Sequence, residues 1–213
     1  MCAFKENPRE WGLYVVTDRT QAAGRSLEEV ARAALAGGAR VFQLREKDLE
    51  ARELTVMAEQ LLCLIRPAGG LLLVNDRIDV ALAVGADGAH LSQRSLPPGV
   101  ARRLLGPERL LGVSCHSVAE ALEAQEGGAD FILLGPIFFT PSKAPYGVPL
   151  GLEILKQIQP QIHLPILAIG GINRTNRQEV LTAGADGVAV VSAVMAAPDV
   201  SEAVRALLSE PHF

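Results

Sequence analysis

The chain alternates between short, continuous apolar runs and longer amphipathic segments along its whole length. Continuous rather than alternating apolar runs are typical of parallel strands that are covered on both faces. We expect strands over residues 13–18, 41–47, 71–76, 89–91, 110–116, 131–136, 165–171 and 187–192. We expect helices over about residues 26–37, 49–65, 78–84, 97–105, 151–158, 176–183 and 200–208, with a further helix opened by Ser117.

Local signals mark the ends of these helices. Ser26 with Glu29, and Ser117 with Glu120, have the spacing of capping boxes. Similar short motifs at 36–40, 84–87, 127–130 and 183–186 each precede an even-numbered strand, and we interpret them as structural turns. Eight strand–helix units in 213 residues favour a closed barrel over a doubly wound open sheet. The prediction is a single (β/α)8 TIM barrel over residues 1–213, with residues 1–11 as an N-terminal extension.

Composition narrows the class of protein. The chain is 49% hydrophobic with a net charge of -4, which permits a large core and argues against general nucleic-acid binding. Cys2, Cys63 and Cys115 lack zinc-site spacing, so we expect free thiols. Neither a signal peptide nor an apolar run of about 20 residues is evident. We expect a cytoplasmic protein with small-molecule partners, no nucleic acid and no membrane; a homo-oligomer is compatible with the sequence.

Polar residues recur at the predicted carboxyl ends of the strands, where barrel enzymes carry their active sites. If the barrel closes, these residues converge on one mouth. They are Asp18, Gln43, Arg45, Lys47, Asn75, Asp76, His90, Gln93, Ser114, His116, Gly135, Gly170, Gly171 and Ser192.

The segment from Val41 to Lys47 places Gln43, Arg45 and Lys47 on one side of an extended chain. Two interpretations are open: a strand end paired with Glu46 and Asp48, or an anion site, because Arg and Lys suit phosphate oxygens. Lys143 and Asn75 would complete a group of donors suited to pyrophosphate. Asp76 beside them is suited to hold Mg2+ through one carboxylate and the phosphate oxygens of a substrate.

Two further features allow two interpretations each. Gly170, Gly171 and Ser192 follow the seventh and eighth strands, where barrels often bind phosphate, but the glycines would also suit a tight strand exit. His116 is placed to act as an acid or base near neutral pH, or to cap the next helix. We expect His90 to be a core residue.

The chain resembles thiamine-phosphate synthases, in a superfamily that also contains the TenI-type thiazole tautomerases. The resemblance rests on Gln43-Leu-Arg-Glu-Lys47, Val74-Asn-Asp-Arg77, Gly85-Ala-Asp-Gly-Ala-His-Leu91, Gly112-Val-Ser-Cys-His116, Gly135-Pro-Ile-Phe138, Ala168-Ile-Gly-Gly-Ile172 and Gly184-Ala-Asp-Gly-Val-Ala-Val-Val-Ser192. It implies an enzyme that joins hydroxymethylpyrimidine pyrophosphate to thiazole phosphate and releases pyrophosphate.

The resemblance also implies roles for individual residues. The pyrophosphate would be held by Gln43, Arg45, Lys47, Asn75 and Lys143, with Asp76 on Mg2+. Ser114 would touch the pyrimidine. The thiazole phosphate would be bound by Thr140, Ser142, Gly171, Val191 and Ser192.

One departure from the family pattern weakens the expected metal site. Ser95 stands where the synthases usually have a second Mg2+-binding Asp, and Arg94 precedes it. Alternatives are therefore a tautomerase that uses His116 as acid and base, and a barrel that binds thiazole phosphate without chemistry. A barrel of sugar-phosphate metabolism is a fourth. The synthase is favoured because the five residues expected to hold pyrophosphate and Mg2+ are all present: Gln43, Arg45, Lys47, Asn75 and Asp76.

Overall fold

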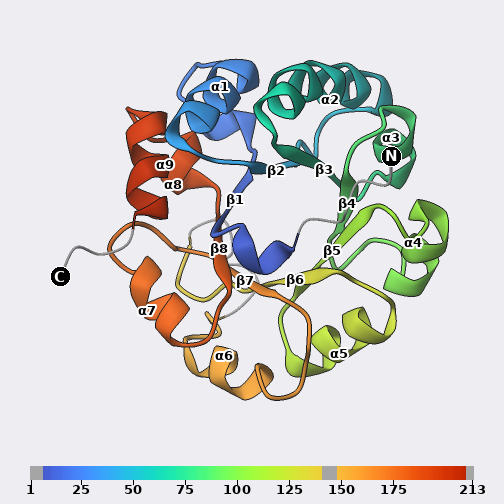
Figure 1. Ribbon diagram of the computed structural model, residues 1–213, viewed down its shortest axis with the longest axis vertical. Coiled ribbons are helices and arrows are strands. Elements are labelled where there is room, and N and C mark those ends of the chain that lie inside the picture. The colour runs from blue at the N-terminus through green and yellow to red at the C-terminus, as the bar shows by residue number, and fades with distance from the viewer. Residues whose placement is uncertain (1–6, 141–147, 210–213) are drawn as a thin grey trace.

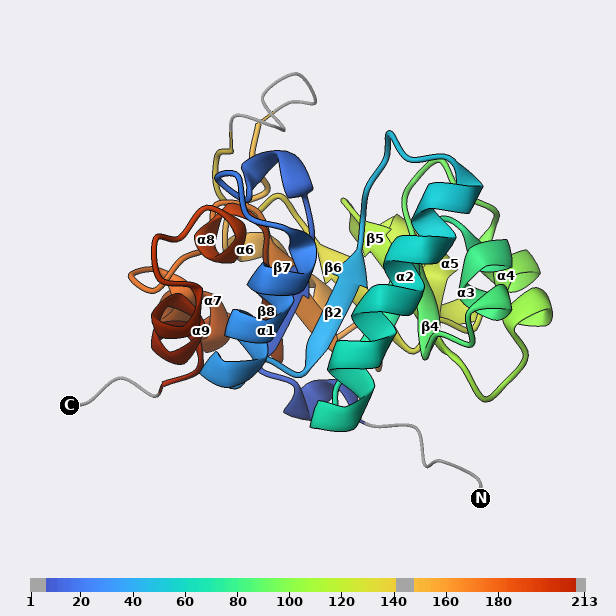
Figure 2. The ribbon, with the colours of Figure 1, turned by 90° about the horizontal axis from the view of Figure 1, so that it is seen from above.

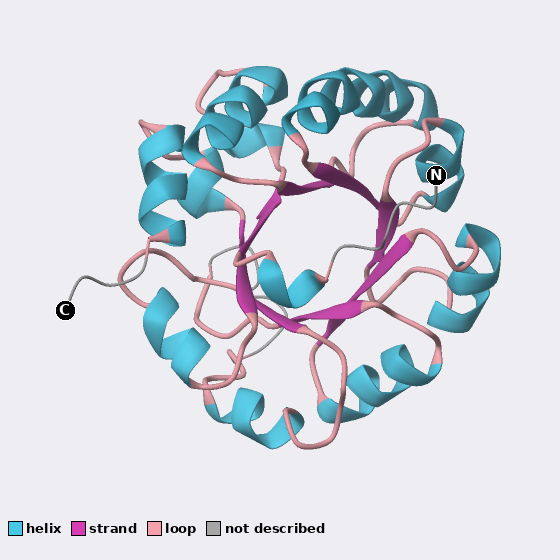
Figure 3. Cartoon of the chain, in the orientation of Figure 1, coloured by secondary structure: helices cyan, strands magenta, loops and turns pink. Residues whose placement is uncertain are grey.

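The computed structural model describes residues 7–140 and 148–209. Its strands are all parallel and pair in chain order, and β8 closes the ring against β1. Figure 3 shows this ring of strands inside a ring of helices, which confirms the predicted (β/α)8 barrel. The strands are β1 (Leu13–Val16), β2 (Val41–Leu44), β3 (Leu71–Asn75), β4 (Gly88–Leu91), β5 (Leu110–Cys115), β6 (Phe131–Leu134), β7 (Ile166–Ile169) and β8 (Gly187–Val190).

The helices lie where the amphipathic segments predict them, with ends that differ by a few residues. A short helix after β8, α8, was not predicted. The α-helices are α1 (Leu27–Gly37), α2 (Ala51–Ile65), α3 (Ile78–Ala83), α4 (Pro98–Leu105), α5 (Val118–Glu126), α6 (Glu153–Ile158), α7 (Arg177–Thr182), α8 (Ser192–Met195) and α9 (Val200–Leu208). Three 3-10 turns, η1 (Pro8–Glu10), η2 (Arg19–Gln21) and η3 (Arg66–Ala68), complete the described elements, none of which is a helix long and apolar enough to cross a membrane.

Both predicted N-caps form, but only Ser26 and Glu29 make a complete capping box. The Ser26 side chain accepts a hydrogen bond from the Glu29 N–H at 3.1 Å, and the Glu29 carboxylate accepts one from the Ser26 N–H at 2.7 Å. The Ser117 hydroxyl accepts from the Glu120 N–H at 3.2 Å. These bonds satisfy backbone donors that the first turn of a helix leaves unpaired.

The core has two layers, one between the strands and the helices and one inside the barrel. The inner layer contains an aromatic cluster of Trp11, Tyr14 and Phe131, with the rings of Trp11 and Phe131 5.0 Å apart in an edge-to-face arrangement. The turn η1, dark blue at the centre of Figure 1, lies across one end of the barrel. Pro8 is buried and Trp11 packs in the inner aromatic cluster, so residues 8–11 cover the barrel floor while Arg9 and Glu10 stay exposed.

Figure 2 shows the barrel from the side, with η1 and η2 at opposite ends. The turn η2 follows the carboxyl end of β1, so it marks the mouth of the barrel, and η1 marks the floor. The predicted site residues that follow β1 to β5 therefore lie at the η2 end.

Three of the four turn motifs before the even-numbered strands form a repeated clamp at the floor. Asp87, Asp130 and Asp186 each accept a hydrogen bond from the N–H of a residue in the preceding odd-numbered strand, at 2.9, 2.7 and 2.8 Å. Each carboxylate also faces an arginine: the pairs are Arg66–Asp87, Arg102–Asp130 and Arg9–Asp186. The structural interpretation of these motifs is confirmed.

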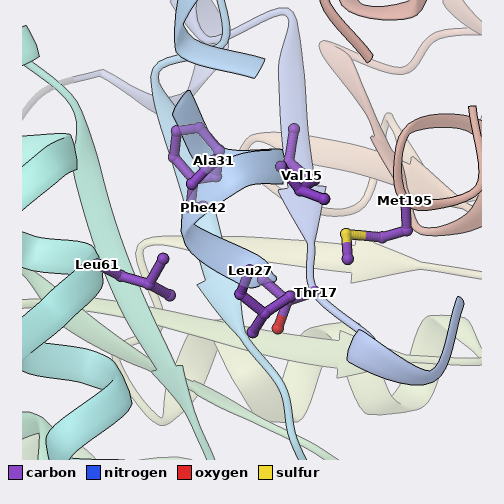
Figure 4. Close-up of a pocket in the computed structure, with 8 residues that line it drawn as sticks. Val15, Thr17, Leu27, Ala31, Phe42, Leu61 and Met195 are labelled. Carbon is purple, nitrogen blue, oxygen red and sulfur yellow. The ribbon is translucent and has the colours of Figure 1, made fainter. Parts of the chain in front are cut away.

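A small apolar cavity lies outside the barrel wall, between β1, β2 and the helices α1, α2 and α8. Figure 4 shows Val15, Phe42, Leu61 and Met195 around it. Its volume is about 10 Å³, which is at the lower limit for a single water molecule, and its lining is almost wholly apolar. This cavity is a packing defect rather than a ligand site.

We predict that Asp130→Ala lowers the free energy of unfolding by about 2–4 kcal/mol, because it removes the acceptor of the Leu111 N–H and leaves Arg102 without its 2.6 Å ion pair. Urea unfolding measures this. Asp79→Ala, which removes an exposed ion pair on α3, is the matched control and should cost less than about 1 kcal/mol. Equal losses for the two variants would contradict the clamp.

Candidate active site

The alternation of side chains along the strands brings three polar residues to the mouth. Val41, Leu73 and Leu110 belong to the inner core, and Gln43, Asn75 and Ser114 follow them at even spacings, so they also face inward. Gln43 Nε2 lies 3.4 Å from Asn75 Oδ1. The inner wall is thus apolar at the floor and polar at the mouth.

The acidic residues beside Arg45 and Lys47 are neutralised from elsewhere. Glu46 is only 6% exposed and accepts hydrogen bonds from Thr17 Oγ1 at 2.7 Å and from the Arg19 guanidinium at 3.1 Å. The same guanidinium pairs with both oxygens of Asp48, at 2.6 and 2.5 Å. The bonds that Arg19 donates to Asp48 and then Glu46 raise the pKa of Arg19.

Arg45 and Lys47 therefore have no carboxylate partner within 4.0 Å in residues 7–140 and 148–209. The interpretation of this strand end as a plain salt-bridged one is wrong. Burial, followed by the charge of Arg45, lowers the pKa of Lys47; Arg94 lowers it further and Asp76 opposes the change. The charges of Arg45 and Arg94 therefore repel that of Lys47, an arrangement that a bound anion would stabilise.

Asp76 is held in an unusual backbone conformation, with φ at +58°. Asp tolerates this left-handed region better than most residues, and its occurrence outside glycine often marks a functional position. The Asp76 N–H donates to the His90 carbonyl at 2.8 Å, which ties the end of β3 to β4.

Four donors converge on the Asp76 carboxylate. Oδ1 accepts from the Ser92 N–H at 2.7 Å and from the Ser95 hydroxyl; Oδ2 accepts from the Ser92 hydroxyl at 2.9 Å and from Asn75 Nδ2 at 2.8 Å. Burial raises the pKa of Asp76, but hydrogen bonds from Ser95, then Ser92 and Asn75, outweigh it and lower the pKa. Asp76 is thus an ionised acceptor, and Ser95 faces it directly.

A cavity of about 340 Å³ opens beside Asp76. This volume is sufficient for a small phosphorylated ligand. Its lining combines three cations, two carboxylates, one amide and one hydroxyl with three leucines of the barrel rim: Leu44, Glu46, Lys47, Leu49, Leu54, Asn75, Asp76, Arg77, Ser92 and Arg94.

The donor set fits Mg2+ only in a minimal form. Within the described residues, no group of three or more His, Cys, Asp or Glu side chains could hold a metal ion. Mg2+ bound to substrate phosphates needs only one or two carboxylates and keeps several waters. Asp76 meets that requirement, with the hydroxyls of Ser92 and Ser95 beside it.

His90 is a core residue, as predicted, but it also supports the site. It is 1% exposed, and its Nε2 lies 2.9 Å from the Ser114 hydroxyl, so it orients the inward-facing serine. Gly112 leaves room for the ring: a Cβ there would lie 2.4 Å from His90 Nδ1. Burial lowers the pKa of His90 to about 3, so the ring is neutral at physiological pH.

Gly170 and Gly171 make the tight exit from β7 that one interpretation required. Both have positive φ, and a Cβ on Gly171 would lie 2.8 Å from Phe138 Cβ. The chain after β8 turns at Val191 into α8, which begins with Ser192. Gly171, Val191 and Ser192 thus follow the carboxyl ends of β7 and β8. Thr140 is the last residue described before the gap, and Ser142 and Lys143 lie outside the described residues, so the roles predicted for these residues stay predictions.

His116 follows β5, and its ring is oriented by α5. Its Nδ1 lies 3.1 Å from Glu120 Oε2, and the His116 N–H donates to the same oxygen at 2.8 Å. His116 therefore links β5 to the first turn of α5, and Glu120 also accepts from Gln93 at 3.4 Å.

The sequence did not identify several residues that hold this site in place. Thr17, Arg19 and Glu46 form the network beside β2, and Ser92 anchors Asp76. Arg19 could have been suspected from its position just after the first strand, but only the fold shows that it reaches Glu46 and Asp48.

The fold and this cavity define a (β/α)8 barrel with a charged pocket beside Asp76, of a size suited to a small ligand. A family model described as thiamine monophosphate synthase matches residues 13–194. The chain belongs to the thiamine monophosphate synthase family.

Individual relatives agree with this membership. A putative thiamine-phosphate synthase of Geobacter sulfurreducens is 52% identical over 200 residues, covering 94% of each chain. A thiamine-phosphate synthase of Moorella thermoacetica is 51% identical over 198 residues, covering 93% of this chain and 94% of that one.

Two solved structures are similar to the chain, one at the level of the family and one at the level of the fold. A thiamine phosphate pyrophosphorylase from Pyrococcus furiosus has a TM-score of 0.85 at 42% identity, with 93% of this chain and 94% of that chain covered. A 3-hexulose-6-phosphate synthase, at 17% identity and a TM-score of 0.68, covers 92% of this chain and 97% of that one and shows the shared fold alone.

The buried His90 predicts a loss of stability in acid. Its pKa is about 3 in the folded protein and about 6.5 when unfolded, so between these values the unfolded chain binds the extra proton. The stabilisation is fully present above the unfolded pKa and falls by up to about 1.4 kcal/mol per pH unit as the pH drops below it. The free energy of unfolding, measured with urea from about pH 7 to pH 5, should fall more steeply for the wild type than for His90→Gln. Parallel pH profiles for the two proteins would refute the lowered pKa of His90.

Proposed function

We propose that the chain is a transferase that joins hydroxymethylpyrimidine pyrophosphate to thiazole phosphate, with release of pyrophosphate. The observation that carries this proposal is Lys47, a cation that lines the Asp76 cavity without an ion-pair partner among the described residues and lies close enough to Arg45 to be repelled by its charge. The family membership and the names of the relatives support it.

In this proposal the diphosphate of the pyrimidine substrate lies across the cavity. Arg45 and Lys47 bind its oxygens as cations, and Gln43 and Asn75 add neutral amide donors at the inner edge. Lys143, outside the described residues, is proposed to approach from the loop after β6. Ser114, held by His90, contacts the pyrimidine.

The thiazole phosphate is proposed to bind after β6 to β8. Gly171, Val191 and Ser192 would present backbone groups to its oxygens, because they follow β7 and β8, which are paired neighbours in the barrel. Thr140 and Ser142 would add hydroxyl donors from the neighbouring loop. The two substrates would then lie on one mouth, with their reacting atoms close together.

The chemistry consists mainly of stabilising a leaving group. The bond between the pyrimidine methylene carbon and the diphosphate oxygen breaks, and the electron pair leaves with pyrophosphate. The cations around the cavity stabilise that developing charge, and the thiazole nitrogen then forms the new C–N bond with its lone pair. Mg2+ held by Asp76 would neutralise further negative charge on the phosphate oxygens.

A second candidate function is favoured by one observation, the His116–Glu120 contact. A histidine whose Nδ1 is held by a carboxylate is suited to move protons, as a TenI-type thiazole tautomerase requires. A barrel that binds thiazole phosphate without chemistry is the remaining alternative. Neither accounts for Arg45 and Lys47 on the side of the mouth near Asp76.

We predict that Lys47→Ala lowers the rate of thiamine phosphate formation about a hundredfold, because a cation that stabilises the leaving group is lost. The measurement is product formation from the two phosphorylated substrates with Mg2+. Lys156→Ala removes an exposed lysine of α6 that pairs with Glu153, and it should retain wild-type turnover. An unchanged rate in Lys47→Ala would refute the role of Lys47.

His116→Ala distinguishes the two candidate functions. A synthase should keep most of its turnover, since His116 is not among the groups proposed to hold either substrate. A tautomerase should lose nearly all of its activity, because its acid and base is gone. Wild-type protein that isomerises thiazole phosphate but makes no thiamine phosphate would contradict the synthase proposal.

A further inference from the structure

The loop after β4 adds to the cavity a cation, Arg94, that has no part in the proposed binding of either substrate. Arg94 lines the cavity together with Lys47, Asn75 and Asp76. Its charge contributes to the lowered pKa of Lys47, so the two cations lie close enough to repel one another. Like Lys47, Arg94 has no carboxylate within 4.0 Å among the described residues.

The other arginine of the cavity wall is different. Arg77 donates two hydrogen bonds to Asp79, at 2.9 and 2.6 Å, and is neutralised by that carboxylate. The cavity therefore contains two guanidinium groups, of which one is already paired and the other is available to an anion.

Asp76 fixes the loop that carries Arg94. It binds the backbone and hydroxyl of Ser92 and the hydroxyl of Ser95, the residues on either side of Arg94. The Ser95 N–H also donates to the Ser92 carbonyl at 3.0 Å, which closes a tight turn. Arg94 thus projects from a turn that is anchored on both sides to the cavity wall.

The same contacts occupy Asp76 itself. A carboxylate offers about four acceptor positions, and four donors already converge on it. A metal ion at Asp76 would have to displace or rotate at least one of these donors. The cavity has a surplus of positive charge and few open metal-ligand positions, which favours binding of a phosphate group by side chains.

We infer that Arg94 is a further ligand of the diphosphate group, an inference that rests on the proposed function, and that this cavity holds inorganic pyrophosphate without a divalent cation. Arg94 acts through its guanidinium, which can donate two parallel hydrogen bonds to phosphate oxygens. Asp76 acts first as the anchor of the Ser92–Ser95 turn. Mg2+ strengthens the binding but is not required for it.

The test is isothermal titration calorimetry of the full-length protein with inorganic pyrophosphate, in EDTA and in Mg2+. Wild-type protein should bind in EDTA. In EDTA, Arg94→Gln should weaken pyrophosphate binding about tenfold or more, because a charge-assisted contact is lost. In Mg2+ the loss of affinity should be smaller, because the cation strengthens the binding of both proteins. Arg94→Lys should restore part of the affinity.

The matched control is Arg103→Gln, which removes an equal charge from an exposed position on α4 whose guanidinium contacts the Gly99 carbonyl. It should change the affinity less than about twofold, because Arg103 does not line the cavity and its exposed charge is screened by solvent and salt. No binding by wild-type protein in EDTA, or equal affinities for wild type and Arg94→Gln, would overturn the inference.

A second variant acts in the opposite direction. Ser95→Asp places a carboxylate next to Asp76, so it should weaken pyrophosphate binding in EDTA and strengthen the binding of Mn2+ alone, measured by electron paramagnetic resonance. Unchanged pyrophosphate affinity in EDTA would contradict the charge balance described here.

The assays separate this inference from the proposed function. Protein that binds pyrophosphate through Arg94 but forms no thiamine phosphate would contradict the function alone. Protein that forms thiamine phosphate, while Arg94→Gln binds pyrophosphate as well as wild type, would contradict the inference alone.

Discussion

The contact of Arg19 with Glu46 and Asp48 is the interaction on which the site depends. The charges of residues 45–48 alternate in sign, and Arg19 forms ion pairs with the two acidic residues, Glu46 and Asp48. One guanidinium from the loop after β1 therefore neutralises both carboxylates. The mouth then keeps its positive charge at a position where burial already disfavours it.

Asp76 has the complementary role on the other side of the cavity. It is an ionised carboxylate, yet most of its contacts are with neutral donors of the turn after β4. The Asp76 carboxylate therefore stabilises the turn after β4, because hydrogen bonds to an ionised group are stronger than those between neutral groups. The position of Arg94 and the ionisation of Asp76 are therefore coupled.

Much of the fold could be predicted because a parallel barrel has a strong local signal. Continuous apolar strands, capped helices and the Asp-containing turns are all readable within a few residues of one another. The polar residues at the strand ends could be assigned to one mouth for the same reason. Contacts between different βα units could not be predicted, since Arg19 with Glu46 depends on how far a loop reaches across the mouth.

The same limit applies to the metal site. The substitution at Ser95 is visible in the sequence, but its consequence depends on the four donors that surround Asp76. Two predicted ligands, Ser142 and Lys143, lie outside the described residues, and the roles assigned to them rest on the family resemblance. Gly171 was correctly placed at the exit from β7, where its packing against Phe138 alone already requires a glycine.

The three Asp–Arg clamps lie at the end of the barrel opposite the cavity, and each joins two consecutive βα units. Arg40 occupies the corresponding position in the first pair and donates to the carbonyls of Leu35 and Ala39 instead. These contacts hold neighbouring strands together at the floor, so a substitution of Arg94 or Ser95 at the opposite end leaves all three clamps in place.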